Sequence, residues 1–273
     1  MSDTLGEHLD DATMLVVDPT APTSVIQPDD GWSRPVVRAY WIAAGALALV
    51  ILVCGIVAVA TNWTPTGDDS FLVMRARDVI SANPPLLSTA SSGGASAGTA
   101  YNHPGPIVQY LNAPFVWALG TTGAALGCAV INAVCVLAIA WMGRRSTRAA
   151  VAAPILAGTA AVCWAMGSEV LIDPWNPHIA TLSFFTLVVA AWAVLRGRPA
   201  ALPIGIVAGS LAAQTHLSFA AISAVAVAIM TATAVIHGVR AVRAGRSDDP
   251  SGFRRYGSAR TLYHFHSDNA SAY

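Results

Sequence analysis

Charged residues are scarce in this chain. Only 11% of its 273 residues are Asp, Glu, Lys or Arg, whereas a soluble globular domain has about 25%. Lysine is absent, and all fifteen basic residues are arginine. The formal net charge is zero, so no basic surface for a nucleic acid is expected. This deficit of charge, beside a hydrophobic content of 55%, excludes an ordinary soluble domain and favours a membrane protein.

Cysteine is also scarce, and its placement gives no sign of a redox site. Cys54, Cys128, Cys135 and Cys163 all fall inside apolar stretches, and none belongs to a Cys-x-x-Cys motif. Free thiols in such surroundings behave as small buried hydrophobic groups. The histidines and acids do not have the spacing of a compact metal motif. The sequence therefore predicts no cofactor and gives no support for a divalent metal.

The chain is rich in apolar runs, several of them about 20 residues long, which is the length of a transmembrane helix. Within lipid a helix satisfies its own backbone hydrogen bonds, and the runs lack the alternation of β-barrel strands. The sequence therefore predicts an all-α polytopic membrane protein with about six transmembrane helices. The predicted spans are residues 36–60, 122–142, 149–166, 179–195, 201–214 and 217–239.

Polar segments flank this transmembrane domain of residues 36–239. Residues 1–35 are acidic and rich in Asp, Pro and Thr, which predicts a disordered cytoplasmic tail. They are not a signal peptide, because the first apolar run is too long and begins too late. Residues 240–273 are polar as well, and two interpretations stay open: a cytoplasmic tail, or the aberrant end of a truncated protein.

The longest polar break within the domain is the loop of residues 61–121. Residues 71–80 are expected to form a short amphipathic helix, and the Pro-, Ser- and Gly-rich residues 81–100 to be mobile. Residues 107–119 are apolar but number only about 13, so an interfacial or re-entrant helix is expected there. Pro106 is well placed to start it.

The arginines predict the orientation. They cluster before the first span and after the second, fourth and sixth, and the positive-inside rule places these ends in the cytoplasm. The protein is therefore expected to cross the plasma membrane several times, with a cytoplasmic N-terminus. All acids of the domain and three of its histidines then lie on the outer face: Asp68, Asp69, Asp78, Glu169, Asp173, His103, His178 and His216. Arg75 and Arg77 lie there against the rule, which suggests that they bind an anion.

Two candidate motifs belong to the long loop, and each has a structural alternative. The adjacent carboxylates of Asp68 and Asp69 suit a general base or metal ligands, or else cap the following helix. His103 precedes a Pro-Gly-Pro turn into an apolar helix. A helix-start turn explains the prolines, but it does not explain the histidine.

Two further candidate motifs lie beside the later spans. In the sequence Asp-Pro-Trp-Asn-Pro-His the indole can stack on a sugar and the polar groups can hydrogen-bond, whereas an interfacial turn is the structural alternative. The sequence Gln-Thr-His ends the fifth span, where polar groups cost little. The candidate residues of these motifs are Asp173, Trp175, Asn176, His178, Gln214 and His216.

In their order, these motifs resemble the GT-C superfamily of polytopic glycosyltransferases, such as the protein O-mannosyltransferases and aminoarabinose transferases. The arrangement is similar to actinobacterial integral membrane proteins of that superfamily, over about residues 36–235. The motifs that carry the resemblance are Gly67-Asp68-Asp69, the turn His103-Pro104-Gly105-Pro106 with its helix ending at Gly120, Trp175-Asn176-Pro177 and Gln214-Thr215-His216.

The resemblance implies transfer of a sugar from a polyprenyl-phosphate donor in the membrane to an acceptor outside the cytoplasm. The family's loop-one acid would map to Asp68 or Asp69 as general base. Arg75, Arg77 or a loop histidine would neutralise the leaving phosphate. Family members usually have about twice as many spans, so this chain would be a truncated form that carries the acid-bearing half, and an inactive fragment stays an open interpretation.

Two other classes of protein stay open. A transporter or channel subunit tends to place polar groups at the bilayer midplane, whereas the spans of this chain are nearly free of charge. A non-catalytic membrane scaffold fits the frequent Gly and Ala residues of the spans, which allow close helix packing. A scaffold would tolerate substitution of the loop acids and histidines.

Overall fold

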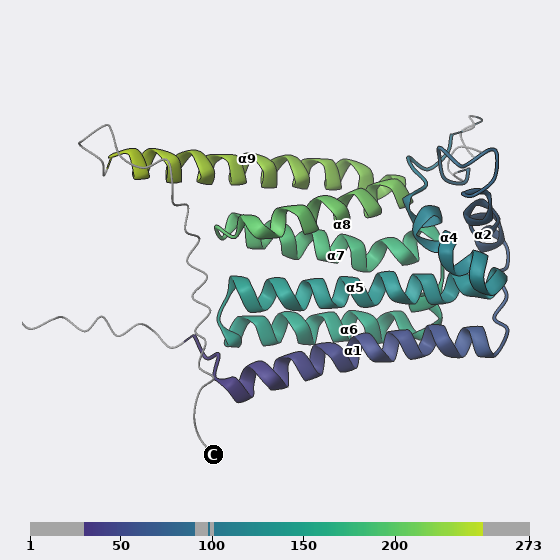
Figure 1. Ribbon diagram of the computed structural model, residues 1–273, viewed down its shortest axis with the longest axis horizontal. Coiled ribbons are helices and arrows are strands. Elements are labelled where there is room, and N and C mark those ends of the chain that lie inside the picture. Colours follow the sequence, from purple (N-terminus) through teal and green to yellow (C-terminus); the bar gives the residue numbers. More distant parts are fainter. Residues whose placement is uncertain (1–29, 91–97, 99–100, 248–273) are drawn as a thin grey trace, which may run out of the picture. The chain divides into compact units, whose positions relative to one another are not determined.

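The computed structural model describes residues 30–90, 98 and 101–247 of the chain (Figure 1). Within them the regular structure is helical, as predicted. The predicted tail up to residue 29 lies outside this part. So do residues 91–97 and 99–100 of the predicted mobile segment, and the end of the chain from residue 248.

Five helical stretches of the described chain are long and apolar enough to cross a membrane, so the fold is an all-α membrane bundle. They contain α1 (Arg34–Ala60), α5 (Gly123–Ser146), α6 (Ala149–Ile172), α7 (Asn176–Leu195) and α9 (Leu217–Ser247). The segment predicted as the fifth span forms the shorter apolar helix α8 (Leu202–Thr215), after the 3-10 turn η2 (Pro199–Ala201). Helix α8 packs between α7 and α9 (Figure 1).

Helix α5 is the centre of the bundle and packs against α1, α4, α6 and α7 (Figure 1). Small residues allow these close contacts, as is typical of helices in lipid. At Gly55 of α1, a Cβ atom would lie 2.7 Å from the Cβ of Ala129. Asn132, fully buried in α5, donates a 2.8 Å hydrogen bond to the carbonyl of Leu171. This bond satisfies a carbonyl in the last turn of α6.

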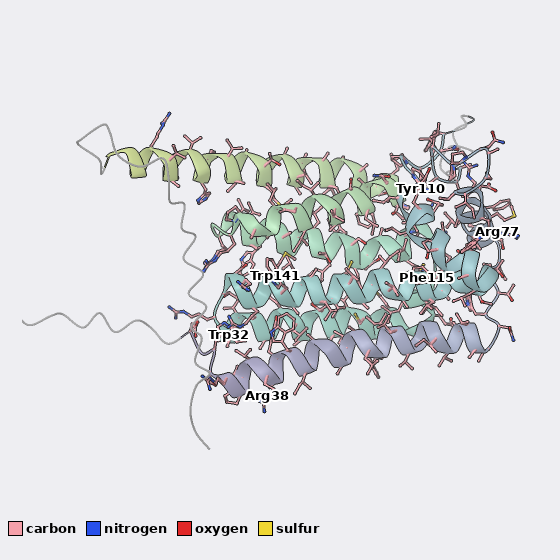
Figure 2. All side chains as sticks on the ribbon, in the orientation of Figure 1. Trp32, Arg38, Arg77, Tyr110, Phe115 and Trp141 are labelled. Carbon is pink, nitrogen blue, oxygen red and sulfur yellow. The ribbon has the colours of Figure 1, made fainter. Side chains whose placement is uncertain are left out.

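The long helices alternate in direction, so the polar segments gather at two ends of the bundle (Figure 1). We call one the arginine end: it carries the starts of α1 and α6 and the ends of α5, α7 and α9. Trp32, Arg38 and Trp141 mark it in Figure 2. We call the other the loop end, and it carries residues 61–90 and 101–122, the α6–α7 turn and the α8–α9 junction.

The long loop contains two short helices, as predicted: α2 (Asp68–Asp78) and α4 (Ile107–Leu119). The backbone breaks at Gly120, whose φ of +71° lies in the left-handed region that favours glycine, and the 3-10 turn η1 (Gly120–Thr122) leads into α5. Gly123 of α5 then lies against the carbonyl of Phe115, and Gly127 lies against Asn112. The second pair of contacting residues lies further from the turn than the first in both helices, so α4 folds back along α5.

Two predicted boundaries are wrong. The polar loop expected from Gly167 to His178 is much shorter, because the helix resumes after a break at Gly167 (φ +71°) and continues to Ile172. Helix α7 then begins at Asn176. The last span, expected to end at residue 239, continues as α9 to Ser247. Arginines are favourable at the C-terminal end of a helix, where the macrodipole is negative, so they need not mark its end.

Candidate functional site

A cavity of about 570 Å³ opens at the loop end, between α2, the loop that follows it, the start of α7 and the α8–α9 junction. We call it the α2–α7 cavity. Six of the predicted site residues line it: Asp68, Arg75, His103, Trp175, Asn176 and His216. They come from four separate regions of the sequence. The folded chain therefore brings most of the predicted polar residues around one space.

The loop after α2 is held across the cavity by a short antiparallel pairing. The backbone N–H of Ser88 donates to the carbonyl of His103 at 3.3 Å, and that of His103 donates to the carbonyl of Thr89 at 3.1 Å. Gly105 follows, and its N–H donates to the carbonyl of Gln214 at 3.3 Å. A side chain at Gly105 would collide with that of Gln214. Gln214 thus supports the turn and does not line the cavity.

Two histidines form one wall of the cavity. The ring centroids of His103 and His216 are 5.4 Å apart, and His103 is only 7% exposed. Burial lowers the pKa of His103, and the neighbouring His216 lowers it further. Nδ1 of His103 has no partner among the described residues. Nδ1 of His216 accepts the N–H of Ser218 at 3.3 Å, which leaves its Nε2 as the donor of a neutral ring.

An acidic cluster joins α2 to the turn between α6 and α7. One oxygen of Asp173 accepts the backbone N–H of Trp175 at 3.1 Å, and the other lies 2.6 Å from Nδ1 of His178. The carboxyl of Asp69 lies beside that of Asp173, and repulsion between two carboxylates favours the protonated form of Asp69. Burial raises the pKa of Asp69 to about 7, with further contributions from Asp173 and Asp68. His178 belongs to this cluster and does not line the cavity.

Adjacent acids at the start of α2 therefore have different surroundings. Asp69 is half-buried in the cluster, whereas Asp68 is exposed and lines the cavity. Of this adjacent pair, Asp68 is consequently the carboxylate that a ligand in the cavity can reach.

The two arginines of α2 also separate. They are two positions apart on a helix, hence about 200° apart around its axis. Arg75 lines the α2–α7 cavity and donates from Nη2 to the carbonyl of Leu87 at 3.3 Å. Arg77 is exposed and lines a second cavity, against α4 (Figure 2). The two arginines that were predicted to bind an anion therefore line two different cavities.

Several residues that line the cavity are not among the predicted site residues. Phe71, Met74 and Asp78 line it from α2, and Ser88, Thr89, Ala90, Asn102 and Pro177 complete the lining. The sequence does contain a signal for part of this set. Positions 68, 71, 75 and 78 have the spacing of one helix face, so the predicted residues Asp68 and Arg75 imply that Phe71 and Asp78 lie beside them.

No group of three or more His, Cys, Asp or Glu side chains is arranged to hold a metal ion in residues 30–90 and 101–247. Comparisons with protein-family models, curated proteins and solved structures found no match for this chain. The chemistry of the α2–α7 cavity is therefore the basis for a function. It offers two carboxylates, Asp68 and Asp78, that can accept a proton, one guanidinium and two imidazoles for an anion or hydroxyls, and one indole to stack on a ring.

Proposed function

We propose that this protein is a membrane glycosyltransferase of GT-C type, which moves a sugar from a polyprenyl-phosphate donor to an acceptor on the extracytoplasmic side of the plasma membrane. One observation carries the proposal. A single cavity at one end of an apolar bundle is lined by Asp68, Arg75, His103, Trp175 and His216. Such a set suits a ligand that is part sugar, part phosphate and part lipid.

Asp68 acts as the general base. It accepts the proton of the acceptor hydroxyl while the acceptor oxygen forms a bond to the anomeric carbon of the sugar. The bond from that carbon to the phosphate oxygen breaks, and the phosphate leaves with the electron pair. Arg75 stabilises the charge that develops on the phosphate, because a guanidinium matches phosphate oxygens with a fork of N–H donors.

The remaining lining residues orient the sugar. The indole of Trp175, 40% exposed, offers a flat apolar face to a sugar ring. Nε2–H of His216 donates to a hydroxyl or to the phosphate. The cavity volume of about 570 Å³ suits a sugar phosphate. The polyprenyl chain stays in the bilayer, beside the apolar helices.

The position of the cavity supports an extracytoplasmic reaction. The arginine clusters gather at the opposite end of the bundle, and the positive-inside rule assigns that end to the cytoplasm. The donor's phosphate and sugar then lie at the outer membrane surface.

Native mass spectrometry of the protein extracted from its own membranes tests the proposal. We expect a retained lipid with the mass of a polyprenyl phosphate or polyprenyl-phospho-sugar. Arg75→Gln should lose it, whereas Arg77→Gln, the matched control on the opposite face of α2, should keep it. A folded sample with no such lipid, or equal retention by both variants, would contradict the proposal and favour a scaffold.

A further inference from the structure

Helix α2 separates two cavities with different linings. The second cavity, of about 380 Å³, lies between α2 and α4, and we call it the α2–α4 groove. Its walls are mostly apolar, with Ala76 from α2 and Ile80 from the turn after it facing Ala113, Val116 and Trp117 from α4. None of the residues proposed to act in sugar transfer lines it. The groove is therefore a separate feature that the proposed function does not use.

Arg77 is the charged side chain of the groove, and no carboxylate is among the described residues that line it. The guanidinium is exposed and makes no hydrogen bond or ion pair with another described residue. Arg75, two positions earlier, is instead bonded to the carbonyl of Leu87. A guanidinium above apolar walls favours an anion with a phosphate-like fork of oxygens.

The surroundings of Arg77 indicate where such an anion comes from. Trp117 is 76% exposed on α4, and Ile80 is 66% exposed in the turn after α2. Both form part of the groove. In membrane proteins an exposed indole sits at the level of the lipid headgroups, and exposed aliphatic side chains face the acyl chains. Arg77 thus lies where headgroup phosphate and apolar chain meet.

We propose that the α2–α4 groove binds an anionic membrane phospholipid. Its phosphodiester pairs with Arg77, and one acyl chain lies along α4 past Trp117. The acyl chain buries apolar surface in the groove, which a free phosphate ion cannot do. An anionic headgroup is favoured over choline, because the lining holds no carboxylate for a headgroup cation. The groove holds the glycerophosphate and the first methylenes, and the rest of the lipid stays in the bilayer. The inference does not rest on sugar transfer.

The test is a lipid titration of the purified, delipidated protein, followed by native mass spectrometry. We expect one tightly held phosphatidylglycerol per chain. Arg77→Gln should weaken its binding by about tenfold or more, the loss of a charge-assisted contact. Arg77→Lys should restore part of the affinity, and Arg75→Gln, the matched control, should leave it unchanged. Circular dichroism checks that each variant keeps its helix content.

A second measurement places the lipid. Phosphatidylglycerol with brominated acyl chains should quench tryptophan fluorescence, and Trp117→Phe should remove part of that quenching while the lipid still binds. Three outcomes would overturn the proposal: equal affinity of phosphatidylglycerol and phosphatidylcholine, equal affinity of soluble glycerol phosphate, or no difference between Arg77→Gln and Arg75→Gln. The second of these would identify the groove as a free-phosphate site.

Discussion

At the scale of single residues, the acids at the loop end divide into two roles. Asp68 is exposed to the α2–α7 cavity, whereas Asp69 lies beside Asp173, which is also paired with His178. Asp69 is not among the residues that line the cavity. The geometry therefore separates a carboxylate that a ligand can reach from a cluster that joins α2 to the α6–α7 turn.

This division predicts unequal effects of two matched substitutions. Asp68→Asn should lower sugar transfer by about 10²–10⁴-fold, the usual contribution of a general base. Asp69→Asn should lower it far less, because the amide can still donate a hydrogen bond to Asp173. Transfer in proteoliposomes, with helix content as a check on folding, measures both. A larger loss of transfer for Asp69→Asn than for Asp68→Asn would identify Asp69, and not Asp68, as the general base.

The acidic cluster also predicts how stability depends on pH. The pKa of Asp69 rises from 3.8 to about 7, so the folded protein keeps a proton that the unfolded chain loses. This group's contribution to stability is therefore present below about pH 4 and is lost as the pH rises to about 7. Because solvent screens a partly exposed carboxyl, we expect this loss of stability to be on the order of 1 kcal/mol, which corresponds to a fall of about 2–4 °C in Tm.

Thermal unfolding in detergent measures this effect as a difference between two proteins. Asp69→Asn lacks the titrating carboxyl but keeps Asp68, Asp173 and His178. The melting temperature of the unmodified chain minus that of the variant should fall between about pH 4.5 and about pH 7.5. Parallel pH profiles would show that the folded protein does not raise the pKa of Asp69.

The sequence could predict which residue types form the site, but not every contact among them. The acids, histidines and Trp175 stand out because polar groups are rare between residues 36 and 239. The proximity of Asp69 to Asp173 joins elements far apart in the chain, and no local pattern encodes it. The separation of Arg75 from Arg77 follows from helix geometry alone and was available from the sequence.

At the scale of elements, the α4–α5 hairpin determines the shape of the loop end. The length of residues 107–119 correctly predicts a helix apart from the long spans. Its direction depends on glycines that permit close approach, with Gly123 against the Phe115 carbonyl and Gly127 against Asn112. Spacing of apolar residues cannot reveal such contacts. The same limit applies to α6, where the break at Gly167 does not end the helix.

The hairpin yields a stability prediction. Gly123→Ala places a methyl group against a backbone carbonyl that cannot move without shifting α4, so the variant should be less stable by about 1–3 kcal/mol. Gly158→Ala is the matched control, because a Cβ there meets open space on α6. Alanine favours a helix by up to about 1 kcal/mol over glycine, so the control should be neutral or slightly stabilised.

Thermal unfolding of both variants in the same detergent provides the comparison. If α4 packs on α5 as described, only Gly123→Ala should lower the melting temperature. Equal melting temperatures would mean that α4 is not held in this hairpin.

At the scale of the whole molecule, charge is segregated between the two ends of the bundle. The arginine clusters gather at one end, while Asp68, Asp69, Asp173 and the α2–α7 cavity lie at the other (Figure 1). The sequence predicted this segregation from the order of spans and arginines alone. It could not show that residues from α2, the long loop, the start of α7 and the α8–α9 junction line one cavity, because that depends on how the helices pack.

The segregation predicts the orientation, which single cysteines can test. Ala82 is exposed at the loop end, and Ala200 is exposed at the arginine end. Three native cysteines are buried and Cys54 is half-buried, so the unmodified chain serves as the background control. In intact cells a membrane-impermeant maleimide should label Ala82→Cys, and it should label Ala200→Cys only after lysis, because the positive-inside rule keeps arginines in the cytoplasm. The reverse pattern would place the cavity in the cytoplasm, where an extracytoplasmic transfer reaction could not use it.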